Sequence, residues 1–305
     1  MRRQLPHEGT QLFLTYTGME TDLIFTQGVD LPGFASFPLL ETAEGRRRLL
    51  SYVQDLAKLA QATDMGVIFE STTWVANADR GHAIGYRAAD LDKANRDAIA
   101  FLVEARSTLG DVPTLISANI GPRADAYAPQ DRMTPEQAAA YHATQIATLT
   151  TTQADLITGY TLAYPNEAIG ILQAAKAHSL PCIIAFTVEM DGRLPTGDTL
   201  EAAITAVDAA TNGYASYFMI NCAHPDHFAD VLTNAPWAHR VQGIVANASR
   251  CSHAELDNAT ELDAGNPTEF GAQLAALRHT HRQLRVLGGC CGTDMRHLGE
   301  LAGRL

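Results

Sequence analysis

Three cysteines in the C-terminal third of the chain have the spacing and surroundings for joint chemistry. Cys290 and Cys291 are adjacent within the glycine-rich stretch 288–292, and Cys222 ends an apolar run much earlier in the sequence. Consecutive residues of an extended strand point to opposite faces, so both adjacent thiols reach one point only if the backbone leaves that form. The flanking glycines permit this because glycine tolerates positive φ. Three thiolates would bind Zn²⁺ and leave one coordination position open, as in catalytic zinc sites.

The charge of such a site indicates its chemistry. Zn²⁺ with three thiolates has a net charge of −1, whereas three neutral histidines would leave +2. A thiolate-rich ion polarises water weakly, but it binds a substrate thiol and lowers the thiol pKa from its usual ~8.5. The bound sulfur stays electron-rich, so the sequence indicates alkyl transfer to a thiol rather than hydrolysis.

Other residues of metal-binding type have simpler interpretations. Cys182 lies in an apolar run and is expected in the core, and Cys251 is expected in a loop. His224 and His227 flank Pro225 at a predicted helix start, which favours capping or surface roles over metal ligation.

Eight short apolar runs alternate with longer amphipathic segments along the whole chain. The predicted strands are Leu12–Tyr16, Gly66–Glu70, Thr114–Asn119, Asp155–Tyr160, Cys182–Thr187, Tyr217–Asn221, Gly243–Asn247 and Arg285–Gly289. The predicted helices are Glu44–Ala62, Asp90–Leu109, Pro135–Thr150, Asn166–His178, Leu200–Thr211 and Pro267–His281.

Eight strand–helix units of about 38 residues each predict a single α/β domain over residues 1–305, a (β/α)8 TIM barrel. Nearly continuous apolar strands suit a parallel sheet that is covered on both faces. An open doubly wound sheet is the alternative, but the sequence contains neither a dinucleotide fingerprint nor a phosphate-binding loop.

Composition excludes several classes of protein. With 46% hydrophobic and 18% charged residues the chain can bury a large core, and a net charge of −12 disfavours nucleic acids and anionic membranes as partners. No apolar run is long enough to span a membrane, and the run at 12–14 is too short for a signal peptide. Five cysteines do not suggest a disulfide framework, so we expect a reduced, cytoplasmic protein.

In a TIM barrel, catalytic residues lie where strands end and the following loops begin. Aromatic side chains there could attract a cationic substrate, although packing at the barrel rim is an equal alternative. Asparagines at strand ends could orient substrate or metal ligands, or serve only in turns. The candidate substrate-binding residues are Tyr16, Glu70, Trp74, Asn119, Tyr160, Phe186, Asn221 and Asn247.

At these residues the sequence resembles the zinc-dependent homocysteine S-methyltransferase family, which includes betaine-using and S-methylmethionine-using enzymes. Asn221–Cys222 with Pro225 resembles the first-ligand motif of that family, and the stretch 288–292 resembles its paired-ligand motif. The resemblance spans almost the whole chain. It implies a TIM barrel, Zn²⁺ held by Cys222, Cys290 and Cys291, and methyl transfer from a sulfonium or quaternary ammonium donor to homocysteine, giving methionine.

Two departures from the family pattern concern the acceptor. The resemblance implies carboxylates, which hold the acceptor ammonium group, at the positions of Tyr16 and Tyr160. A tyrosine hydroxyl brings no charge at neutral pH. Glu20, Glu70 and Glu189 are candidate replacements.

Two alternatives to the homocysteine reaction therefore stay open. One is a methyltransferase or demethylase acting on another thiol, and the other is a zinc-bearing barrel without catalysis. The expected partners are a small thiol and a cationic methyl donor. The chain lacks the C-terminal extension of the betaine-using enzymes, so we expect a monomer or small homo-oligomer.

Overall fold

The computed structural model describes residues 3–305, in which eight parallel strands close into a barrel. Each strand pairs with the next in sequence, and β8 pairs with β1, with Phe13 opposite Val286. The strands are β1 (Phe13–Leu14), β2 (Gly66–Glu70), β3 (Thr114–Ile120), β4 (Leu156–Leu162), β5 (Cys182–Phe186), β6 (Phe218–Asn221), β7 (Val241–Ala246) and β8 (Val286–Gly289). All eight predicted strands are confirmed, and the closed order excludes the doubly wound alternative.

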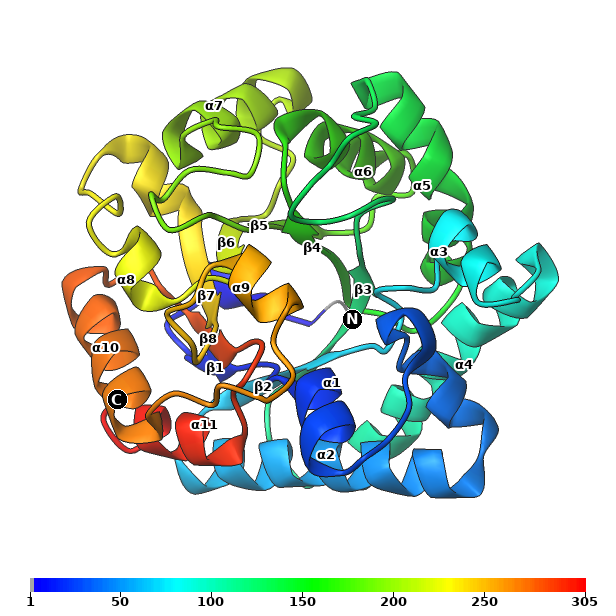
Figure 1. The fold of residues 1–305 in the computed structure, drawn as a ribbon, viewed down its shortest axis with the longest axis horizontal. Helices are drawn as coiled ribbons and strands as arrows, with labels where there is room; N and C mark the ends of the chain where they lie inside the picture. Colours follow the sequence, from blue (N-terminus) through cyan, green and yellow to red (C-terminus); the bar gives the residue numbers. More distant parts are fainter. Residues whose placement is uncertain (1–2) are drawn as a thin grey trace.

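A ring of helices surrounds the barrel in the view down its axis (Figure 1). The α-helices are α1 (Met19–Thr21), α2 (Ala43–Ala62), α3 (Ala78–Ala83), α4 (Ala88–Ser107), α5 (Pro135–Thr150), α6 (Pro165–Ala177), α7 (Leu200–Thr211), α8 (Pro225–Phe228), α9 (His253–Asp257), α10 (Pro267–Thr280) and α11 (Met295–Ala302). The six predicted helices are confirmed, with ends that differ by at most two residues. The helix start predicted at Pro225 is that of α8, whereas the sequence analysis missed α1, α3, α9 and α11.

Local sequence explains where α5 begins. Thr134 accepts a hydrogen bond from the backbone N–H of Gln137, whose side chain accepts one from the Thr134 N–H. This reciprocal pair satisfies two N–H groups that lack helical partners, and Pro135 supplies the φ that the first helical residue needs.

The core has two layers because successive strand residues point to opposite faces. In β2, Val67 and Phe69 pack outward among the helices, whereas Ile68 points into the barrel. Leu5, from the segment before β1, is buried within this inner layer. Both faces of each strand are thus apolar, which is why the strands form continuous apolar runs in the sequence. None of the described helices is both long and apolar enough to cross a membrane.

Candidate active site and metal centre

Three thiols meet where β6 and β8 end. The sulfur of Cys222 lies 3.1 Å from that of Cys290 and 3.7 Å from that of Cys291, and all three sulfurs lie within 4.8 Å of one another. Two thiolates bound at about 2.3 Å to one tetrahedral Zn²⁺ would be separated by about 3.8 Å. None of the three is in a disulfide. The three-thiol donor set therefore fits a zinc ion, and the separation of Cys222 and Cys291 matches that of two ligands of one tetrahedral ion.

The crowded sulfurs perturb each other's ionisation. Hydrogen bonds from Cys290 and Cys291 hold the pKa of Cys222 well below the usual thiol value. The same pairing with Cys222 raises the pKa of Cys290 and of Cys291. Three thiolates this close repel one another, so they do not all ionise without a counter-charge. A bound divalent cation would supply that charge.

Cys222 turns toward the other thiols because its backbone adopts the left-handed region, with φ of 57°. This is uncommon for a residue other than glycine and requires support from its surroundings. The carbonyl oxygen of Cys222 accepts a 3.0 Å hydrogen bond from Asn247 Nδ2 and lies 2.6 Å from His253 Nε2. The other ring nitrogen of His253 lies 3.0 Å from a carboxylate oxygen of Glu189.

A second left-handed residue, Thr161, lies at the end of β4 with φ of 60°. The side chain of Asn221 fixes it, since Oδ1 accepts from the Thr161 N–H and Nδ2 donates to the Thr161 hydroxyl. The residue immediately before Cys222 therefore links the ends of β4 and β6.

The glycines beside the paired cysteines act differently from the expectation. Only Gly292 has positive φ, at 79°. A Cβ on Gly288 would lie 2.9 Å from the carbonyl oxygen of Tyr16, and one on Gly289 would lie 2.1 Å from the Thr293 hydroxyl. Gly288 and Gly289 therefore let the end of β8 approach neighbouring atoms closely, and positive φ is found at Gly292 and at Cys222.

A cavity of about 70 Å³ lies against the thiols, and we call it the inner cavity. Among the described residues of its lining, Glu20 is the only aspartate, glutamate, lysine, arginine or histidine. The lining also has an aromatic group: Tyr16, Phe34, Trp74, Tyr127 and Tyr160. The structure thus brings five of the eight candidate substrate-binding residues to this cavity: Tyr16, Trp74, Asn119, Tyr160 and Asn221.

The other three candidates lie elsewhere. Phe186 is fully buried and stacks on Phe218 between the barrel and the helices, so the expectation that it lines the site is not met. Its neighbour Ala185 faces the barrel interior, as does Ile183 of the same strand. Asn247 supports the Cys222 carbonyl, and Glu70 accepts a 2.9 Å hydrogen bond from the hydroxyl of Tyr160.

The three candidate replacement carboxylates are in different surroundings. Glu20 lines the inner cavity and accepts a 2.7 Å hydrogen bond from Ser36 Oγ. Glu70 accepts hydrogen bonds from Tyr160 and Thr15, and its second oxygen is buried without a described partner. Burial raises the pKa of Glu20 and of Glu70 to about 7. Glu189 is bonded to His253 and lies outside the cavity lining.

Two residues at the site were missed by the sequence analysis. The Tyr127 hydroxyl lies 3.0 Å from the sulfur of Cys222, and the Tyr127 ring stacks on His253 at a centroid distance of 3.9 Å. Tyr127 belongs to the loop between β3 and α5, and His253 is the first residue of α9. An aromatic residue in a long loop carries no periodic signal, and His253 was not singled out from the sequence.

A larger cavity of about 580 Å³ adjoins the inner one, and we call it the outer cavity. The two share Thr21, Phe34, Trp74, Tyr127 and Cys291. The outer cavity is acidic, with Asp125, Asp257, Glu261 and Asp263 in its lining. Arg80 also lines it, with its guanidinium 4.2 Å from the centre of the Trp74 ring and its Nη1 buried without a described partner.

The other residues of metal-binding type lie outside the thiol cluster. Cys182 is buried in the core and Cys251 is exposed, as expected. His224 caps α8, where its Nδ1 accepts from the Asp226 N–H, and burial lowers its pKa to about 4.

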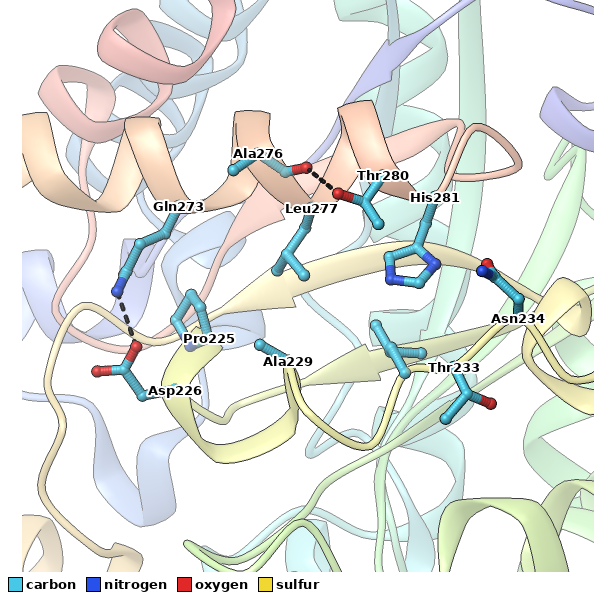
Figure 2. Close-up of a pocket in the computed structure, with 11 residues that line it drawn as sticks. Pro225, Asp226, Ala229, Thr233, Asn234, Gln273, Ala276, Leu277, Thr280 and His281 are labelled. Atoms are coloured by element: carbon cyan, nitrogen blue, oxygen red, sulfur yellow. Dashed lines mark hydrogen bonds between the residues drawn. The ribbon is translucent and has the colours of Figure 1, made fainter.

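A separate cavity of about 400 Å³ lies on the outside of the barrel between α8 and α10, where the helix after β6 is short (Figure 2). The carboxylate of Asp226 in this cavity is already bonded to Gln273 and paired with Arg250. No cysteine lines this cavity, so it is distinct from the candidate site.

Comparisons with known proteins agree with the barrel fold and identify a family. The structure of the homocysteine methyltransferase MmuM from Escherichia coli is similar in its metallated form, with a TM-score of 0.74 and 18% identity over 98% of this chain and 97% of that one. The oxidized form of the same enzyme is similar with a TM-score of 0.75 and 19% identity, over 99% of this chain and 100% of that one. No curated protein sequence matched significantly. The sequence profile of the homocysteine S-methyltransferase family matches residues 18–305, nearly the whole chain. The chain therefore belongs to the homocysteine S-methyltransferase family and is a methyltransferase.

Proposed function

We propose that this protein is a zinc-dependent methyltransferase that moves a methyl group from an onium donor to the thiol of homocysteine, giving methionine. The observation that carries the proposal is the meeting of Cys222, Cys290 and Cys291 beside a cavity at the ends of the barrel strands. Zn²⁺ held by these thiolates would bind the acceptor thiol and keep it deprotonated.

In the transfer step, an S–CH₃ bond forms at the acceptor and the donor's S–CH₃ or N–CH₃ bond breaks. The bonding electron pair stays with the donor and cancels its positive charge, while the thiol proton is released to solvent. The chain's own contribution is to position the two reactants in line, which is a large source of rate for such displacements. The fixed turns at Cys222 and Thr161 suit that role because both are held by side-chain hydrogen bonds.

The outer cavity supports a cationic donor that also carries a carboxylate. Its four acidic residues attract a cation, and aromatic rings continue from it into the inner cavity. Arg80 makes no ion pair among residues 3–305, so a donor carboxylate would give its guanidinium the partner it lacks. Sulfonium amino acids and carboxylated quaternary amines both meet this description.

The test is the Cys290→Ala variant. We expect it to lose bound zinc, measured as metal per protein chain, and to lose methylation of homocysteine by a panel of carboxylated sulfonium and ammonium donors. Cys251→Ala is the matched control, since Cys251 lies outside the cluster. Full zinc content and full activity in Cys290→Ala would refute the proposal.

The same assays separate the alternatives. A zinc-loaded wild-type protein that methylates other thiols but not homocysteine would favour a different acceptor. A protein that binds zinc but neither binds nor methylates any thiol would favour a barrel without catalysis.

A further inference from the structure

The inner cavity is lined by a carboxyl group, Glu20, for which no described residue supplies a counter-charge. Apart from the three thiols, Glu20 is the only acidic or basic side chain among the described residues of the lining, and no lysine, arginine or histidine of residues 3–305 forms an ion pair with it. Among the described residues, its side chain accepts a hydrogen bond from the hydroxyl of Ser36, which is itself buried. An unpaired carboxylate in such a place is unfavourable until a cation reaches it.

A second group in the same lining also lacks a partner. Asn119 is 8% exposed, and its Oδ1 is buried with no hydrogen-bond partner among the described residues. Glu20 and Asn119 therefore present a carboxylate and an amide oxygen, both of which accept hydrogen bonds. An ammonium group has three N–H donors and no acceptor, so it matches this pair in charge and in hydrogen bonding.

We propose that Glu20 binds the ammonium group of the thiol acceptor, which makes the acceptor an aminothiol. The inference rests on the proposed function. It assigns ammonium binding to Glu20, whereas the family resemblance implies carboxylates for this role at other positions. At the two positions where the resemblance implies carboxylates, this chain has Tyr16 and Tyr160, and both line the same cavity as Glu20. The carboxylate of this cavity therefore comes from Glu20 in α1 rather than from the ends of β1 and β4.

The other carboxylates near the site do not fill this role. Glu70 is outside the lining and already accepts hydrogen bonds from Tyr160 and Thr15, and Glu189 is bonded to His253. Glu20 also lines the same cavity as Cys222, Cys290 and Cys291. An acceptor whose sulfur lies at the thiol cluster can therefore place a nearby ammonium group on Glu20.

The experiment compares homocysteine with 4-mercaptobutanoate, which has the same thiol and carboxylate but no amino group. Binding of each to the wild type and to Glu20→Gln is measured by calorimetry on protein of known zinc content, and kcat/KM is measured with an active donor. We expect the wild type to prefer homocysteine about 10- to 100-fold and Glu20→Gln to lose most of that preference. The variant should bind 4-mercaptobutanoate as well as the wild type does.

Two further variants keep the result interpretable. Glu201→Gln removes an exposed carboxylate at the start of α7 and should keep the preference. Ser36→Ala removes the hydrogen bond to Glu20 and should reduce the preference in the same direction, which provides a test if Glu20→Gln does not fold.

The outcomes separate this assignment from the reaction. If the wild type methylates homocysteine but Glu20→Gln keeps the full preference, or weakens both ligands equally, the assignment is overturned and the reaction stands. If no donor supports turnover, yet the wild type prefers homocysteine and Glu20→Gln does not, the aminothiol site stands and the proposed reaction fails.

Discussion

Replacing Glu70 with glutamine should make the stability of this protein less sensitive to a rise in pH from about 4.5 to about 7. Glu70 lies at the end of β2, where burial raises its pKa from 4.5 to about 7 despite hydrogen bonds from Tyr160 and Thr15. A folded-state pKa above the unfolded value means that the folded protein binds the proton more tightly. The stability that this proton contributes is complete below pH 4.5 and is lost as the pH rises to about 7.

The size of the effect follows from the pKa difference. A rise from 4.5 to about 7 corresponds to at most about 3.5 kcal/mol, since one pKa unit is about 1.4 kcal/mol. Glutamine keeps an oxygen to accept the hydrogen bond from Tyr160 and cannot ionise. The free energy of unfolding of Glu70→Gln, minus that of the wild type, should therefore rise by about 2–3 kcal/mol between pH 5 and pH 8.

Urea unfolding at several pH values measures this difference, with both proteins at equal zinc content. Glu20 is present in both proteins, so its own titration largely cancels in the comparison. Glu201→Gln is the control for loss of one carboxylate at an exposed position. If the free energy of unfolding of Glu70→Gln minus that of the wild type does not change with pH, or increases as the pH falls, Glu70 is not a buried carboxyl without a counter-charge.

Three other changes have outcomes that the structure specifies. Asn247→Ala removes the hydrogen bond to the Cys222 carbonyl, and we expect zinc affinity to fall about 10- to 100-fold in a chelator competition; unchanged affinity would contradict the supporting role of Asn247. Arg80→Gln should raise the KM for a carboxylated donor about 10-fold or more and leave the KM for homocysteine unchanged, and an equal rise in both would argue against a donor site. Gly170→Ala should lower the free energy of unfolding by about 1–3 kcal/mol, because its Cβ would lie 2.4 Å from that of Ala138 on α5. Gly299→Ala is the matched control in thermal unfolding: it lies in α11 with open space around it, and should add about 0.5–1 kcal/mol.

The sequence predicted the barrel because its strands are buried on both faces. A run such as Cys182–Phe186 is apolar throughout, since one side packs inside the barrel and the other against helices. The meeting of Cys222 with Cys290 and Cys291 was predictable for a related reason. The ends of parallel barrel strands lie at one mouth, so residues distant in sequence converge there.

The remainder of the site depends on backbone turns and loops that have no periodic signal. Nothing in the sequence places a left-handed conformation on Cys222, because the usual sign is a glycine, and Asn247 and His253 support it through contacts between distant segments. Tyr127 reaches the thiols from a loop, where spacing does not fix direction. The same difficulty prevented a choice among Glu20, Glu70 and Glu189 from sequence alone.

The distribution of charge between the two cavities suits transfer from a cation. The donor's positive charge disappears as the methyl leaves, so acidic groups in direct contact with the onium would stabilise the starting state more than the transition state. The four acidic residues line the outer cavity, while the inner cavity has five aromatic residues and a single carboxylate. If Glu20 is occupied by the acceptor ammonium, the carboxylate of the inner cavity has a counter-charge and does not contact the donor. The acidic residues can then draw the donor to the outer cavity, and the methyl group can transfer beside aromatic rings, where dispersal of charge is favoured by a less polar environment.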